Sequence, residues 1–195
     1  MRKLAASLYT LISLRVKVCP TDGNEGNFVS LSNWDDSRKV SNVSINKKWS
    51  DTQLNSSKVF DANDKVVLPG IIDTQTHFRE PGSTDTEDLY SGSRAAIAGG
   101  ITSVFEMPNT NPPTSNMKEF QRKLDLAKNR MYCNYAFYFG ATADNAKDLA
   151  SLKDLEGCCG IKLFAGSSTG NLLVAEEEDI ETVFQNSSKV VAVHS

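Results

Sequence analysis

The sequence has no apolar run approaching the roughly 20 residues of a membrane-spanning helix. It also has no block of Lys and Arg, and its net charge is -3, so nothing in it attracts phosphate backbones or anionic lipid in general. These absences exclude the usual signs of a nucleic-acid or membrane partner. We expect neither partner.

Cysteine is scarce as well, and no CxxC or other zinc-ribbon spacing occurs among Cys19, Cys133, Cys158 and Cys159. Buried thiols in a reducing cytoplasm fit this pattern better than a disulfide framework does. Residues 4–14 form a moderately apolar stretch behind a basic tip. Ser and Thr dilute it and no A-x-A cleavage site follows, so it is a weak signal peptide. We therefore expect a cytoplasmic protein.

The composition, 39% hydrophobic and 23% charged, is that of a globular protein. Residues 1–65 are rich in Ser and Asn with short apolar alternations, which predicts a poorly defined β region that ends in a strand over residues 59–67. Residues 66–195 differ from this region. We expect two domains, 1–65 and 66–195.

Strand and helix patterns alternate through residues 66–195, with strand starts about every 30 residues, the length of a βαβ unit. Apolar runs predict strands over 70–73, 101–107, 134–141, 158–165 and 190–195, and helical patterns occupy 87–99, 115–131, 144–155 and 176–187. In the second helix Met117, Phe120, Leu124 and Ala127 form one apolar stripe. Ser115, Asp144 and the acidic residues 176–178 suit helix starts.

This alternation is typical of an α/β fold with a parallel sheet, either doubly wound or closed as a barrel. A complete (β/α)8 barrel takes about 250 residues. If the fold is a barrel, the sequence holds about five strand-helix units and lacks about three. We therefore expect a partial barrel.

Polar side chains recur at every second position of the first parallel strand, where Asp73, Gln75 and His77 are predicted to share a face. A strand end with one structural histidine explains this pattern equally well. Both histidines of the chain, His77 and His194, fall at carboxyl ends of predicted strands, where parallel α/β folds collect their functional groups. This placement favours a metal site.

Lys162 lies within an apolar strand expected to be buried on both faces. A lone buried ammonium is costly, so the amine must be paired, deprotonated or chemically changed. Carboxylation by carbon dioxide would turn it into an anion with two oxygen donors, suited to bridge two metals. A nearby carboxylate, or a side chain that extends to solvent, is the alternative.

Four segments together resemble a dihydroorotase, a cyclic amidohydrolase: VVLPGIIDTQTHFREPGSTDTEDL, FEMPNTNPPT, GIKLFAGSSTGNLLV and VAVHS. The resemblance covers residues 59–195 and implies the first part of a TIM barrel that holds one or two zinc ions. By matched position it implies that His77 is a metal ligand, Lys162 the carboxylated bridge and His194 a ligand of the second metal. A metal-bound water of lowered pKa would then attack the ring amide carbonyl.

The resemblance also implies the substrate. Arg79 and Asn109 match the family positions that hold the substrate carboxylate, a task suited to a guanidinium fork. This pair favours dihydroorotate, interconverted with carbamoyl aspartate in pyrimidine synthesis, over neutral rings. Without the resemblance, Arg79 is equally a surface or helix-capping residue and Asn109 a turn residue before Pro112.

The sequence departs from the family in two ways. Gln75 replaces the first His of the usual HxH, and amide oxygen is a weaker zinc donor than imidazole. A further His ligand and the general acid/base Asp are expected beyond residue 195, so no catalytic acid or base lies within the chain and we expect the 195 residues alone to be inactive.

Two alternative functions remain open. One is a non-catalytic or truncated dihydroorotase-like protein. The other is a cyclic amidohydrolase of the allantoinase, hydantoinase or dihydropyrimidinase type. Apart from the small-molecule substrate, a second copy of the chain or a pyrimidine-pathway enzyme is the expected partner.

Overall fold

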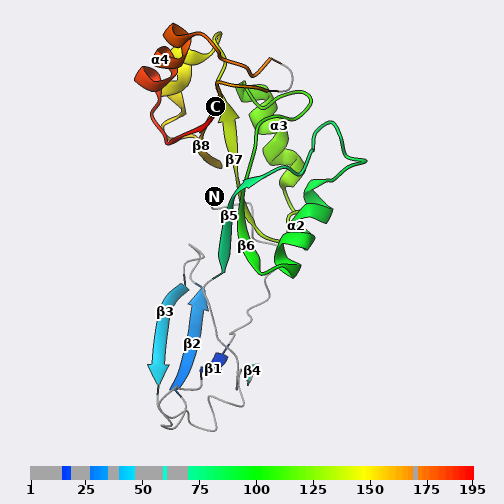
Figure 1. Cartoon of the computed structure of the whole chain (residues 1–195). Coiled ribbons are helices and arrows are strands. Elements are labelled where there is room, and N and C mark those ends of the chain that lie inside the picture. Colours follow the sequence, from blue (N-terminus) through cyan, green and yellow to red (C-terminus); the bar gives the residue numbers. More distant parts are fainter. Residues whose placement is uncertain (1–14, 19–26, 35–39, 47–58, 61–69, 169–170) are drawn as a thin grey trace. The chain divides into compact units, whose positions relative to one another are not determined.

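The structure is a computed structural model that describes residues 15–18, 27–34, 40–46, 59–60, 70–168 and 171–195 (Figure 1). The chain divides into two compact units, Arg2–Pro69 and Gly70–Ser195. In the described part of the chain no helix is long and apolar enough to cross a membrane.

The first unit is a small β-sheet. Its strands are β1 (Arg15–Val18), β2 (Asn27–Trp34), β3 (Val40–Asn46) and β4 (Val59–Phe60), in the order β3-β2-β1-β4. β2 pairs antiparallel with β1 and β3, whereas β4 pairs parallel with β1. The amino-terminal region predicted to be β-structure therefore has a defined sheet, and the predicted continuation of its last strand over residues 61–67 lies outside the described residues.

The second unit is a parallel five-stranded sheet with helices between its strands (Figure 1). Its strands follow one another in sequence order: β5 (Ile71–Thr76), β6 (Ile101–Glu106), β7 (Asn134–Gly140), β8 (Cys158–Phe164) and β9 (Val191–His194). The intervening elements are α2 (Leu89–Ala98), α3 (Met117–Ala127), the 3₁₀ helix η1 (Ala146–Leu152) and α4 (Glu177–Asn186). The predicted partial barrel is confirmed.

A continuous apolar core lies between the sheet and the helices. It joins alternate strand residues such as Val104, Phe137 and Ile161 to Leu89 of α2 and Phe120 of α3. Because successive strand residues point to opposite faces, the neighbours of these residues face away from the helices. This second face carries Lys162.

The apolar stripe of α3 differs from the prediction at one end. Phe120, Leu124 and Ala127 are buried, but Met117 is 52% exposed. Met117 occupies the first turn, which begins beyond the edge of the core. Lys123, also on this side of α3, is fully buried.

Two predicted helix starts also shift. Asn116, rather than Ser115, caps α3, because its Oδ1 accepts from Glu119 N at 3.0 Å. The α-helix predicted over 144–155 is a shorter 3₁₀ helix, and the Asn145 side chain before it closes a local turn by accepting from Thr142 N at 2.9 Å.

Cys133 and Cys158 are buried free thiols and Cys159 is half-buried, while Cys19 lies outside the described residues. Burial raises the pKa of Cys133 to about 11 and that of Cys159 to about 12. These values keep both groups as unreactive thiols at neutral pH.

The alternation predicted for β5 is interrupted. Asp73 pairs with Val104 and Thr76 pairs with Glu106, so three steps along β5 match two along β6. This register shift places Asp73 opposite a residue of the core face. Asp73 therefore does not continue the row of Gln75 and His77, and its Oδ1 instead accepts from Gln75 N at 3.0 Å.

Candidate active site

His77 lies half-buried immediately after β5. Burial, followed by the charge of Arg79 and then those of Lys123 and Lys162, lowers its pKa, while the Asn109 side chain opposes this shift. These influences indicate that His77 lies near the loops after β5 and β6 and near Lys162 of β8. Its imidazole is neutral at pH 7, as a metal ligand or hydrogen-bond acceptor must be.

A network of contacts centred on Glu80 fixes the loop that carries Arg79. Arg130 donates to both oxygens of Glu80, at 2.7 and 3.1 Å, and Leu89 N at the start of α2 donates to Glu80 Oε2 at 3.0 Å. Arg79 itself has φ 59, in the left-handed region, and its carbonyl accepts from Ser83 N at 3.0 Å. Glu80 therefore fixes this loop, and among the described residues the Arg79 guanidinium does not contribute to these contacts.

Asn109 occupies a tightly bonded loop after β6. Thr110 N and Thr114 N both donate to Pro108 O, at 2.8 and 2.9 Å, and Gly140 N donates to Thr114 O at 2.8 Å. The Asn109 Oδ1 atom is buried and has no hydrogen-bond partner among the described residues. The Asn109 side chain nevertheless lies close enough to His77 to raise the pKa of that histidine, so the two residues are neighbours in the candidate site.

Lys162 extends from the middle of β8 and is 3% exposed. Burial lowers its pKa. Its Nζ lies 5.0 Å from the centroid of the Phe164 ring, and within the described residues it forms no ion pair. The carboxylate partner considered as an alternative from the sequence is therefore not found in this part of the chain.

His194 ends β9 beside these groups. It pairs with Phe164 in the register of β8 and β9, and the two ring centroids are 5.8 Å apart. Phe164 thus contacts both Lys162 and His194 on one face of the sheet. The side chains of His194 and Gln75 are exposed.

Arg79, Lys123 and Lys162 thus place positive charge near the neutral imidazole of His77, and Phe164 lies between Lys162 and His194. Within the described ranges, no three His, Cys, Asp or Glu side chains lie close enough together to hold a metal ion. The positive charge around His77 suits an anionic ligand.

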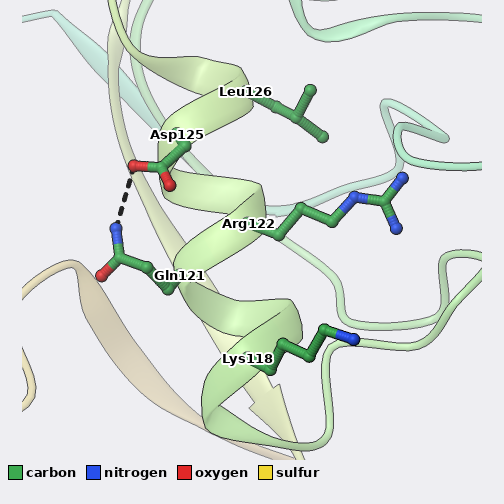
Figure 2. A pocket seen from close by; sticks show the side chains of 5 residues that line it. All are labelled: Lys118, Gln121, Arg122, Asp125 and Leu126. Atoms are coloured by element: carbon green, nitrogen blue, oxygen red, sulfur yellow. Dashed lines mark hydrogen bonds between the residues drawn. The ribbon is translucent and has the colours of Figure 1, made fainter.

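A separate hollow follows the outer side of α3. Figure 2 shows its lining, Lys118, Gln121, Arg122, Asp125 and Leu126, with a hydrogen bond of 3.0 Å from Gln121 to Asp125. None of the predicted site residues lines it.

The sequence analysis missed a buried ion pair behind the site. Glu106 of β6 and Lys123 of α3 contact each other with exposures of only 1% and 0%. The signal was present, because Glu106 is a charge inside a predicted apolar strand and Lys123 lies three residues after Phe120 and four before Ala127, on the apolar face of the predicted helix. Two such anomalies of opposite sign in neighbouring elements indicate a pair.

Residues 66–192 match the amidohydrolase family. The dihydroorotase of Methanosarcina mazei is 40% identical over 135 residues, which are 69% of this chain and 29% of that protein. The allantoinase of Streptomyces avermitilis is 40% identical over 113 residues, 57% of this chain and 25% of that protein. The chain therefore spans about a third or less of the length of these curated relatives.

Solved structures agree with these matches. The L-hydantoinase of Arthrobacter aurescens aligns with a TM-score of 0.75 and 25% identity, covering 95% of this chain and 41% of that one. An inactive dihydroorotase-like domain from Chaetomium thermophilum aligns with a TM-score of 0.55 and 22% identity over 66% of this chain and 38% of that one, which shows a shared fold. With the match over residues 66–192, these findings establish that the chain belongs to the amidohydrolase family.

Proposed function

We propose that this protein takes part in the metal-dependent hydrolysis of a cyclic amide, with dihydroorotate as the ring and carbamoyl aspartate as the product. The proposal is supported by a group of residue types, the metal-binding His77 and Lys162 and the carboxylate-binding Arg79 and Asn109, of which the last three influence the pKa of His77. Dihydroorotate carries a carboxylate, which suits Arg79 and Asn109, and a ring amide, which suits a metal held by His77 and Lys162.

His77 and Lys162 fit a metal by their chemistry. The lowered pKa of His77 leaves its nitrogen lone pair free, and the lowered pKa of Lys162 increases the uncharged amine that reacts with carbon dioxide. In that reaction the Lys162 nitrogen bonds to the carbon of carbon dioxide and releases a proton. We propose that His77 and carboxylated Lys162 hold zinc and that His194 holds a second ion, with Gln75 as a weak additional donor. In such sites a metal polarises the amide carbonyl and activates water.

Arg79 and Asn109 are proposed to bind the substrate carboxylate. A guanidinium presents two parallel donors to a carboxylate, and the Asn109 amide group adds a third. The contacts of Glu80 leave Arg79 available for this task. The expected setting is pyrimidine synthesis in the cytoplasm.

Two specific observations favour other functions. The allantoinase of Streptomyces avermitilis and the dihydroorotase of Methanosarcina mazei are both 40% identical to this chain, over 113 and 135 residues, so a neutral ring is a second candidate substrate. Gln75, in place of a histidine and exposed, favours a non-catalytic relative that binds the ring without opening it.

The test is to incubate the 195-residue chain with zinc and bicarbonate, and to measure both binding and ring opening of dihydroorotate, hydantoin and allantoin. Selective binding of dihydroorotate is expected. Ring opening would establish the enzyme, and binding without turnover would establish the non-catalytic alternative. Selective binding of hydantoin or allantoin would contradict the assignment of Arg79 and Asn109.

A further inference from the structure

The ends of β5 and β6 are joined by a side-chain pair where a backbone hydrogen bond is expected. Thr76 pairs with Glu106, and Met107 N donates to Thr76 O at 2.9 Å. In a regular parallel ladder the next bond would run from Phe78 N to Met107 O. Here Phe78 N donates to Glu106 Oε1 at 3.2 Å, and Met107 O accepts from Lys123 Nζ at 2.8 Å.

Glu106 and Lys123 in turn form a buried ion pair, which connects these two hydrogen bonds. One rung of the ladder is thus replaced by three contacts in series, from Phe78 through Glu106 and Lys123 to Met107. Phe78 N and Met107 O both remain satisfied without a direct bond between them.

This replacement lies directly behind the candidate site. Phe78 follows His77 in the chain, and Met107 precedes Pro108 and Asn109. A direct bond from Phe78 to Met107 would set the separation of the two strand ends by backbone geometry alone. With the pair in place, the length and charge of two side chains set it.

We propose that Glu106 and Lys123 are positioning residues that set the separation and orientation of His77 and Asn109. The inference rests on the proposed function for its effect on ligands, but its geometric content concerns only these two strand ends. Glu106 and Lys123 are buried on the helix side of the sheet, so the proposed role is indirect.

The test uses the full 195-residue chain and the double variant Glu106→Leu/Lys123→Met. Replacing both members of a buried pair by apolar groups avoids a stranded charge and preserves the fold better than either single change. The matched control is Glu119→Gln/Arg122→Met. It removes another acid-base pair of α3, with 3.4 Å between Arg122 Nη1 and Glu119 Oε2, and within the described residues this pair does not bond to the ends of β5 and β6.

Three measurements are made on each variant: thermal melting, the NMR resonances of the His77 ring and the Asn109 side-chain amide without metal, and zinc affinity by calorimetry. We expect the double variant to melt cooperatively, to shift both sets of resonances, and to bind zinc about 10-fold or more weakly, as for groups that orient ligands. The control should match the wild type in all three.

Unchanged resonances in a cooperatively folded double variant would overturn the proposal. If the double variant does not fold, the NMR measurement is repeated on Glu106→Gln. The glutamine amide oxygen keeps an acceptor for Phe78 N, so the His77 and Asn109 resonances should stay nearly unchanged. Shifts as large as those of a Lys123→Met variant would then count against the proposal. If the wild type binds no zinc, the proposed function fails, whereas the resonances still test the positioning role.

Discussion

Lys162 is a buried amine with no carboxylate partner in the described part of the chain, so its burial opposes folding. Burial lowers the pKa of Lys162. At pH values between this lowered pKa and the ordinary lysine pKa of about 10.4, the native state therefore binds fewer protons than the unfolded state. Stability is therefore lost as the pH falls toward neutrality. A buried lysine of lowered pKa is typical of a functional site.

We predict that Lys162→Met raises the free energy of unfolding at pH 7 by about 1 kcal/mol, the order of the penalty for an uncompensated buried polar group. Urea denaturation without zinc or bicarbonate measures this. Lys189→Met, at a partly exposed position, should change stability by less than about 0.5 kcal/mol. A loss of stability in Lys162→Met would show that the amine has a structural partner.

His77 gives the chain a stability that depends on pH. Because its pKa is lowered, the unfolded state binds more protons than the native state between that value and 6.5. Native stability should therefore decrease as the pH falls through this window. We predict that His77→Gln loses less stability than the wild type between pH 7.5 and pH 5, as measured by urea denaturation at each pH. His194→Gln, at an exposed position, is the control, and an identical decrease in all three proteins would contradict the burial of His77.

Arg79 separates charged from neutral rings. We predict that Arg79→Met weakens dihydroorotate binding by about 2 kcal/mol, or about 30-fold, since a charge-assisted pair is lost. Hydantoin lacks the carboxylate, so calorimetry should give its binding nearly unchanged. If Arg79→Met weakened the binding of both rings equally, Arg79 would instead have a structural role in its loop.

Among the helices, α2 has the best-defined start. Asp88 accepts from Ser91 N at 2.6 Å, and Ser91 returns a bond by accepting from Asp88 N at 3.3 Å. We predict that Asp88→Ala lowers the free energy of unfolding by about 1 kcal/mol, as loss of an N-cap does. Thermal or urea unfolding measures the change. Asp85→Ala, a nearby exposed acid outside α2, should have little effect, and equal losses would point to net charge as the cause.

The element order of the second unit was predictable from the sequence because apolar runs and helical periodicity alternate there. The shift between Asp73 and Thr76 was not, because a register irregularity depends on the partner strand and leaves no local signal. The 3₁₀ form of η1 was missed for a similar reason, since Asn145 bonds to the distant Ser115 O and Gly140 O at 2.9 Å.

The site was predictable in part. Placing His77, Asn109 and His194 at or just after strand ends needed only the topology of a parallel sheet, and Lys162 stood out as a charge within an apolar strand. The ion pair of Glu106 and Lys123 joins a strand to a helix 17 positions later. It could be predicted only by considering both buried charges at once. Glu80, which supports the loop of Arg79, pairs with Arg130 50 positions away.

In the whole molecule, the described chain contains a small β-sheet unit and five parallel strands of an amidohydrolase barrel. The proposed ligand site uses only the second unit, and every proposed contact comes from the carboxyl ends of its strands or the loops after them, apart from Lys162 within β8. The central claim is therefore geometric: His77 and Lys162 share one metal.

A crystal of the 195-residue chain grown with zinc and bicarbonate, with anomalous data collected at the zinc edge, tests this claim most directly. The account predicts an anomalous peak within about 2.3 Å of a His77 nitrogen and of an oxygen on carboxylated Lys162. A zinc-loaded crystal in which Lys162 keeps a free amine, or in which the peak lies away from His77, would contradict it.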